Sequence, residues 1–175
     1  APILGDISNV SFNEDEQLIL NLFAEDEEND PLVFTISGGF YISASIENNQ
    51  VTFTSSENYN GSEAFTIFVS DGEYDDSVTI LVTVLPVNDP PSIDTIVEQE
   101  MDEGGTKIII LSANDIDSDG LVFTVDQNEN IEASITGTAL TLIPESNFNG
   151  VEQISVNVTD GEYIVSTSFS LTVNP

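Results

Sequence analysis

Apolar and polar residues alternate along most of the chain with a period of two. Leu18, Leu20 and Leu22 are spaced in this way, and so are Phe65, Ile67 and Val69. This spacing places every second side chain on one face of an extended segment, as in a strand with one buried face. No segment shows the spacing of three to four residues that is typical of an amphipathic helix. The pattern therefore predicts an all-β protein.

Turn-forming residues divide the alternating runs into short strands. Asn48-Asn49 and Asp71-Gly72 are examples in the first half of the chain, and Asp160-Gly161 is one in the second half. Seven short strands in roughly 90 residues are typical of an antiparallel Greek-key sandwich. In the first half we expect strands near residues 3–12, 17–23, 32–37, 40–46, 51–54, 64–70 and 77–85.

The second half of the chain repeats the first. Leu32–Thr35 recurs as Leu121–Thr124, and Asp71–Tyr74 recurs as Asp160–Tyr163, so the offset is 121 − 32 = 89 residues. A repeat of this length is a whole domain rather than a solenoid unit. We therefore expect two tandem seven-stranded Greek-key β-sandwiches arranged end to end. The predicted boundaries are residues 1–86 and 92–175, with a linker at 87–91.

The charge is strongly one-sided and narrows the choice of partner. Asp and Glu number 32, against 1 Lys plus Arg, which gives a formal net charge of −31. Such a chain repels a phosphate backbone and the anionic face of a membrane, so we expect no nucleic-acid partner. The hydrophobic fraction of 39% and the strand-like alternation exclude disorder. Clustered carboxylates in so acidic a chain favour a bound cation.

Other residue types narrow the chemistry further. The sequence has no Cys and no His, which removes disulfides, thiolate zinc sites and the usual catalytic triads. No apolar run is long enough to span a membrane, and no signal peptide is visible, so we expect no direct membrane insertion. Ala1 falls in the middle of the pattern. We expect any targeting segment to lie outside this fragment.

The linker and the acidic loops predict a calcium site. In an up-and-down sandwich, loops that follow alternate strands lie at the same end. The foot of the first module and the head of the second then meet at the linker. Calcium takes six to eight hard oxygen ligands and suits such a set. The side chains expected to converge there are Glu14, Asn88, Asp89, Asp115, Asp117, Asp119 and Asp160.

The same pattern is left half complete at the two ends of the fragment. Asp26, Glu28, Asp30 and Asp71 would face an upstream linker, and Glu103 would face a downstream module. We predict these five residues as further calcium ligands, with neighbouring modules of the same chain as partners.

These motifs resemble those of a known family. Glu14, the acidic loops, Asp-Gly at 71–72 and 160–161, and Asn88-Asp89-Pro90-Pro91 look like cadherin calcium motifs. Pro86–Pro91 and the phrase Asn58–Gly61 resemble bacterial cadherin-like tandem repeats of large secreted or surface proteins. The resemblance covers both modules and implies calcium-dependent rigidity. Carried over by position, it implies Glu14, Asn88, Asp89, Asp115, Asp117 and Asp160 as ligands.

The sequence also departs from the cadherin pattern. Pro86 stands where the linker usually has an acid, and only Glu57 and Asn58 stand near the acidic motif expected before the sixth strand. Fewer acids imply fewer than three ions or weaker sites. The chain has no Trp, so adhesion by strand exchange is not inferred.

The acids also fit two other interpretations. Asp115, Asp117, Asp119 and Gly120 fit part of an EF-hand loop, but the flanking segments are strand-like rather than helical. Scattered acids such as Glu47 are interpreted as solvated surface charges.

Three classes of function follow. We favour a calcium-binding spacer that rigidifies an extended extracellular or cell-surface protein. The alternative is a calcium-dependent carbohydrate-binding or adhesion module, with a polysaccharide or cell-surface ligand. Most Phe residues fall in core phase, which leaves Tyr41, Tyr74 and Tyr163 as exposed aromatic candidates. An enzyme is disfavoured because nothing isolates one acid in an apolar pocket.

Overall fold

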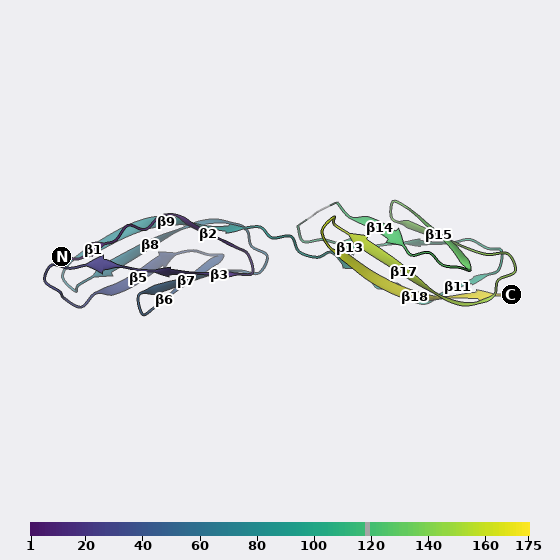
Figure 1. Cartoon of the computed structure of the whole chain (residues 1–175), viewed down its shortest axis with the longest axis horizontal. Coiled ribbons are helices and arrows are strands. Elements are labelled where there is room, and N and C mark those ends of the chain that lie inside the picture. Colours follow the sequence, from purple (N-terminus) through teal and green to yellow (C-terminus); the bar gives the residue numbers. More distant parts are fainter. Residues whose placement is uncertain (118–119) are drawn as a thin grey trace. The chain divides into compact units, whose positions relative to one another are not determined.

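The computed structural model describes residues 1–117 and 120–175, which form two compact units, Ala1–Val87 and Asn88–Pro175. Over the described residues the chain is all-β (Figure 1). Each unit contains nine strands in these residues. The first unit contains β1 (Ile3–Leu4), β2 (Val10–Asn13), β3 (Gln17–Asn21), β4 (Ala24–Glu25), β5 (Val33–Gly38), β6 (Ile42–Glu47), β7 (Gln50–Ser55), β8 (Gly61–Ser70) and β9 (Asp75–Leu85). The second contains β10 (Ser92–Ile93), β11 (Gln99–Asp102), β12 (Lys107–Ile110), β13 (Ala113–Asn114), β14 (Val122–Val125), β15 (Ile131–Thr136), β16 (Ala139–Pro144), β17 (Gly150–Thr159) and β18 (Ile164–Asn174).

The two units share one topology. In the first, a four-stranded sheet has the order β2-β9-β8-β5 and a three-stranded sheet has the order β3-β7-β6, while β1 pairs with β4. The second unit repeats this with β11-β18-β17-β14, β12-β16-β15 and β10-β13. The pairings β2–β9 and β11–β18 are parallel, and the others are antiparallel. Each unit is therefore a β-sandwich, as predicted.

Each sandwich has its own hydrophobic core, built from the alternating residues of its two sheets. In the first unit the rings of Phe53 and Phe65, both fully buried, meet edge to face with centroids 5.1 Å apart. The corresponding part of the second core is aliphatic. The buried core residues are Phe12, Leu22, Phe34, Ile42, Val51, Phe53, Phe65, Ile67, Val69, Ile80, Val82 and Val84 in the first unit, and Leu111, Ile131, Leu140, Leu142, Ile154, Val156, Phe169, Leu171 and Val173 in the second.

The predicted strands at 3–12 and 17–23 are each interrupted. The first becomes β1 and β2, and the second becomes β3 and β4. At the second break the Leu22 N–H donates to Asn49 O while Phe23 O accepts from Gly5 N–H, so the chain changes its pairing partner from β7 to β1. The prediction of seven uninterrupted strands is therefore corrected to nine in the described residues of each unit.

The strand register places the loops at two ends of each unit. In the first unit, the β4–β5 loop and the β8–β9 hairpin lie together, because Val33 pairs with Ser70 and Ser70 with Asp75. We call this end the head. The opposite end, the foot, carries the β2–β3 turn, the β5–β6 loop and the β7–β8 loop. The second unit has the same head and foot by its equivalent pairings.

Candidate metal-binding residues

The head of the second unit joins the linker residue Asn88 to the hairpin residue Asp160. Asn88 Nδ2 donates to Asp160 Oδ2 at 2.9 Å. Asp160 Oδ1 accepts the backbone N–H groups of Glu162 and Tyr163, each at 2.7 Å. Burial raises the pKa of Asp160, but the Asn88 amide and the two N–H groups outweigh it and hold the pKa below its usual value of 3.8. Asp160 is thus an ionised carboxylate turned toward the linker.

A second contact joins Asp89 to the β13–β14 loop. The Asp89 N–H donates to Asp117 Oδ2 at 2.8 Å, and the Asp117 N–H donates to Asp115 Oδ1 at 2.9 Å. Each of these bonds runs from the backbone N–H of one predicted ligand to the side-chain carboxylate of another. Asp119, which was predicted with them, lies outside the described residues.

Glu14, at the foot of the first unit, is the one charged residue among those described that is buried when side chain and backbone are counted together, with 2% of its surface exposed. Its N–H donates to Leu85 O at 2.9 Å, and its Oε1 accepts the Val87 N–H at 2.7 Å. Within residues 1–117 and 120–175, its Oε2 is buried and has no hydrogen-bond partner. A buried carboxylate oxygen in this state is costly without a cation or donor.

The equivalent residue of the second unit lies in a different environment. Glu103 repeats the backbone contact, since its N–H donates to Asn174 O at 2.8 Å, but its side chain is exposed. The Val87 N–H that Glu14 binds has no counterpart beside Glu103, because the repeat places that counterpart after Pro175.

The head of the first unit binds the terminal ammonium of Ala1. The nitrogen lies 3.0 Å from Glu28 Oε2, 3.2 Å from Asp26 Oδ2 and 3.8 Å from Asp71 Oδ2. The side chains of Asp26 and Asp71 are 2% and 5% exposed. Hydrogen bonds to Glu28, which has the larger effect, and to Asp26 raise the pKa of the ammonium from 8.0 to about 10. The three acids thus act together on one cation.

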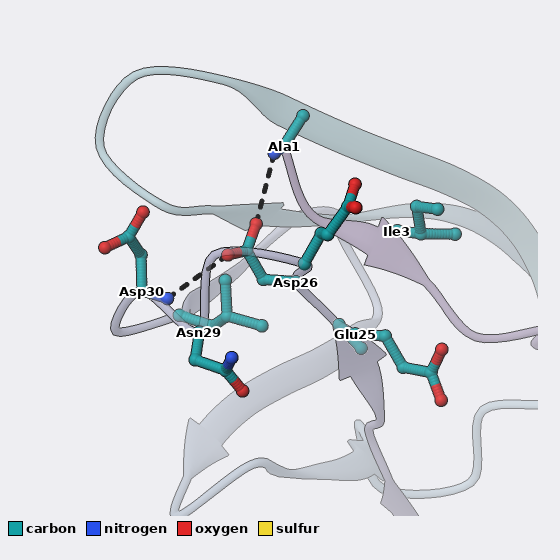
Figure 2. A pocket seen from close by; sticks show the side chains of 9 residues that line it. Ala1, Ile3, Glu25, Asp26, Asn29 and Asp30 are labelled. Carbon is teal, nitrogen blue, oxygen red and sulfur yellow. Dashed lines mark hydrogen bonds and ion pairs between the residues drawn. The ribbon is translucent and has the colours of Figure 1, made fainter.

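Asp26 organises its own loop. Its Oδ1 accepts the N–H groups of Glu28 at 3.0 Å and Asp30 at 3.1 Å. The Asp30 bond lowers the pKa of Asp26, opposed by burial and aided by the Ala1 ammonium. Figure 2 shows Asp26 between Ala1 and the backbone of Asp30, with the Asp30 carboxylate turned away. Asp30 therefore contributes its backbone rather than its carboxylate to this cluster.

Asp71 repeats the arrangement of Asp160. Its Oδ1 accepts the N–H groups of Glu73 and Tyr74, each at 2.7 Å. These two bonds hold the pKa of Asp71 below 3.8 against the opposing effect of burial. The hairpin sequence Asp-Gly-Glu-Tyr therefore fixes an ionised carboxylate at the head of each unit.

The predicted ligands are brought together only in part. In the described ranges, no three side chains of the type His, Cys, Asp or Glu are gathered closely enough to form a metal-binding group. The contacts above link the predicted residues in pairs and short chains, apart from Asp26, Glu28 and Asp71, which all lie near the Ala1 nitrogen. The side chains of the predicted ligands all carry hard oxygen atoms, which calcium prefers as ligands. The buried Glu14 Oε2 in particular is suited to a cation.

The sequence did not predict an exposed aromatic loop at the foot of the first unit. Phe40 was expected in a strand, yet β6 begins at Ile42, and Phe40 lies in the β5–β6 loop with 83% of its surface exposed. Phe40 is thus an exception to the expectation that Phe residues occupy the core. The signal for this loop was the pair Gly38-Gly39, whose positive φ angles of 124° and 81° end the strand.

Comparisons with known proteins agree with this architecture. A family model described as "Bacterial Ig domain" matches residues 1–84 and again 88–174. The chain belongs to the bacterial Ig-domain family. No curated protein matches the sequence. Bacterial Ig and cadherin-like domains are typically extracellular and form surface or adhesion modules. The described residues contain no helix suited to crossing a membrane.

Among solved structures, this bacterial Ig tandem resembles cadherin fragments. A crystal structure of human protocadherin-24 EC1-2 is 21% identical, with a TM-score of 0.66 over 99% of this chain and 98% of that chain. Drosophila N-cadherin EC1-4 is 12% identical, with a TM-score of 0.66 over 100% of this chain and 50% of that chain. At these identities the likeness establishes a shared cadherin-like fold.

A looser match is an endo-fucoidan hydrolase of glycoside hydrolase family 107. It is 17% identical, with a TM-score of 0.43 over 98% of this chain and 28% of that chain. The chain therefore spans less than a third of that hydrolase, and the low score carries no argument about activity.

Proposed function

We propose that this chain is a calcium-binding tandem module that rigidifies an extended extracellular or cell-surface protein. The observation that carries the proposal is the buried Glu14. One of its carboxylate oxygens binds the N–H of Val87, directly before the linker residue Asn88, and the other has no hydrogen-bond partner among the described residues. A divalent cation would supply the missing partner and compensate the cost of burying the charge.

The other proposed ligands come from the linker and the head of the second unit. They are Asn88, Asp89, Asp115, Asp117 and Asp160, together with Asp119 from outside the described residues. Backbone donors already orient several of these carboxylates, as at Asp160 and Asp115. Such orientation lowers the entropy lost when an ion binds. Calcium would neutralise the clustered negative charge and give the ligands a fixed coordination shell. The protein itself has 1 Lys plus Arg and so lacks the positive side chains to neutralise this charge.

The head of the first unit supports the same chemistry. Asp26, Glu28 and Asp71 are the equivalents of Asp115, Asp117 and Asp160, and they hold an ammonium group at 3.0–3.8 Å. We propose that Asp26, Glu28, Asp30 and Asp71 contribute to a calcium site with an adjoining module, and that Glu103 does so at the foot of the second unit.

The function then lies in reach and stiffness. Without metal, carboxylates near the linker repel one another and the linker bends freely. A shared ion would remove the repulsion and bind the segments around it. Neighbouring modules of the same chain are the expected partners, and a spacer in an adhesin or secreted multidomain protein is the expected setting.

The test combines calorimetry with small-angle X-ray scattering. Extracellular modules of this kind bind calcium with a dissociation constant on the order of 10⁻⁴–10⁻³ M. At a free calcium concentration of 100 times that constant, the free energy of unfolding should rise by about 2.7 kcal/mol. The scattering profile in millimolar calcium should show a narrower ensemble than in EDTA.

Matched variants locate the effect. Glu14→Gln and Asp89→Ala should each weaken calcium binding at least tenfold and remove the change in scattering. Glu47→Ala, which removes an exposed strand-end acid outside the proposed ligand set, should leave both unchanged. Identical profiles in EDTA and calcium, or equal losses in Glu14→Gln and Glu47→Ala, would reject the proposal.

A further inference from the structure

Three aromatic side chains form a cluster at the foot of the first unit, which we call the aromatic corner: Phe40, Tyr41 and Tyr59. The Phe40 and Tyr41 rings meet at 85° with centroids 4.7 Å apart, and the Tyr41 and Tyr59 rings stack at 16° and 4.8 Å. Phe40 is 83% exposed and Tyr41 49% exposed. Single exposed aromatics are common on protein surfaces, but a packed group of them marks an interaction site.

The aromatic corner is held by a half-buried carboxylate on the neighbouring strand. Glu63, on β8, accepts the backbone N–H groups of Phe40 at 2.9 Å, Tyr41 at 3.1 Å and Ile42 at 2.9 Å. Burial raises the pKa of Glu63, but these three N–H bonds outweigh it and hold the pKa below 4.5. One carboxylate thereby fixes the backbone of three consecutive residues. The exposed rings therefore stand on a rigid support.

The glycines before Phe40 allow this close approach. A Cβ at Gly38 would lie 2.3 Å from Ala64 O, and one at Gly39 would lie 2.2 Å from Ile42 O. Both positions also have φ angles in the left-handed region. Other residues would push the loop away from β8 and break the contact with Glu63. The loop sequence is thus matched to the presentation of Phe40 and Tyr41.

The β7–β8 loop supplies polar groups beside the rings. The Ser56 N–H and Oγ both donate to Tyr41 O, at 2.8 and 3.1 Å, and the Tyr59 N–H donates to Ser56 O at 3.2 Å. These bonds bring residues 56–60 against Tyr41. Their side chains include the exposed Glu57, Asn58 and Asn60. An apolar surface is therefore bordered by amide, carboxylate and hydroxyl groups.

The second unit shows that the fold does not require the aromatic corner. Glu129 and Asn130 stand at the positions of Phe40 and Tyr41. The acid equivalent to Glu63 is Glu152, which accepts the side-chain amides of Asn128, at 3.1 Å, and Asn130. The same sandwich is thus completed with a polar loop. The aromatic corner is an addition to the first unit that folding alone does not explain.

We propose that the aromatic corner is a binding site for a neutral carbohydrate polymer. The C–H face of a pyranose ring packs well on an exposed aromatic face, and its hydroxyls require hydrogen-bonding groups at the border. The ring pair at 85° and the polar residues 56–60 provide both. The net charge of −31 repels acidic polysaccharides, which leaves neutral ones. This site is independent of the calcium ligands.

The test is affinity electrophoresis of the whole chain in gels containing laminarin, glucomannan or amylose, with calcium and with EDTA. Alginate serves as an acidic glycan, and nona-arginine in free solution serves as a cationic peptide. At least one neutral polysaccharide should retard the protein, in calcium and in EDTA alike, and alginate should not.

Substitutions then locate the binding. Phe40→Ala, Tyr41→Ala and the double change Phe40→Glu with Tyr41→Asn, which copies the second unit, should raise the dissociation constant at least tenfold. Phe23→Ala is the matched control, since Phe23 is 65% exposed in the same unit but outside the aromatic corner. Circular dichroism and thermal unfolding of each variant should match the parent chain.

Three results would overturn the proposal. The first is retardation by none of the neutral polysaccharides. The second is retardation that survives in the Phe40 and Tyr41 variants or is lost equally in Phe23→Ala. The third is binding of nona-arginine alone that depends on Tyr41, which would identify the site as one for a basic protein segment.

Discussion

The β5–β6 loop of the first unit and the β14–β15 loop of the second are each held in place by a glutamate, but through different groups of the loop. Glu63 and Glu152 occupy equivalent places on β8 and β17. Glu63 binds three backbone N–H groups, whereas Glu152 binds the side-chain amides of Asn128 and Asn130. The first arrangement frees the side chains of the loop to face solvent, and the second uses them internally. Both units thus keep a glutamate under the loop, while the side chains on the outer surface of the loop differ between the units.

A second difference between the units lies at the same end, the foot. Glu14 is buried against Val87, and Glu103 is exposed. Glu14 binds the N–H of Val87, and the repeat places the counterpart of Val87 after Pro175, so the two glutamates are not in equivalent surroundings. Substitutions made in pairs, one in each unit, test how far this contrast extends.

The largest expected effect comes from the cores. Phe53 in the first unit and its equivalent Leu142 in the second are both fully buried. Phe53→Ala should lower the free energy of unfolding by about 4 kcal/mol and Leu142→Ala by about 3 kcal/mol, because each leaves a cavity. Chemical denaturation in EDTA should show each variant shifting only its own unit's transition. A shift of both transitions by either variant would mean that the units do not unfold separately.

A smaller and more discriminating effect is expected at the two loop acids. Glu63→Gln should cost about 2 kcal/mol, because backbone N–H groups cannot turn to other partners. Glu152→Gln should cost about 1 kcal/mol or less, since the amides of Asn128 and Asn130 can rotate toward water. Urea unfolding at pH 7 measures both.

The pH dependence gives this pair a second readout. The pKa of Glu63 is lowered in the folded state, so its contribution to stability is present above the ordinary value of 4.5 and is lost as pH falls through the folded pKa. The difference between the parent chain and Glu63→Gln should therefore shrink in titrations from pH 5 to pH 2. A difference that stays constant over this range would show that the carboxylate charge is not what holds the loop.

The smallest expected effect concerns the outer face of the four-stranded sheets. Ser62 Oγ and Thr83 Oγ1 are 2.8 Å apart in the first unit, and Val151 stands opposite Thr172 at the equivalent place in the second. Ser62→Val copies the second unit and should change the free energy of unfolding by less than about 0.5 kcal/mol. Thermal unfolding would detect a larger loss, which would show that the hydroxyl pair is structurally important.

The sequence predicted the sandwich well because side-chain alternation reports which face of a strand is buried. It could not predict the breaks in the first two strands. Leu18, Leu20, Leu22 and Ala24 keep one inward phase while the backbone changes partner from β7 to β1. The period of two carries no information about which strand lies alongside. For the same reason, the parallel pairing of β2 with β9 was not predicted.

For the candidate site, the sequence identified acids and their loops but not their individual states. The burial of Glu14 depends on Val87 and Leu85, more than 70 residues away along the chain. The turned Asp30 carboxylate depends on a local bond to Asp26. The aromatic corner was missed because Phe40 and Tyr41 continue into an apolar strand, and only the structure shows that the strand begins after them. The calcium ligands themselves remain predictions.

The parallel pairing of β2 with β9 also determines how each unit bears mechanical load. Val10 to Asn13 lie beside Val82 to Leu85 in the same direction, and Gln99 to Asp102 lie beside Leu171 to Asn174 in the second unit. Tension between the two ends of a unit pulls these neighbouring strands in opposite directions along their length. Their hydrogen bonds are then sheared together rather than peeled apart one at a time. In single-molecule stretching, each unit should therefore rupture in one abrupt event instead of lengthening gradually.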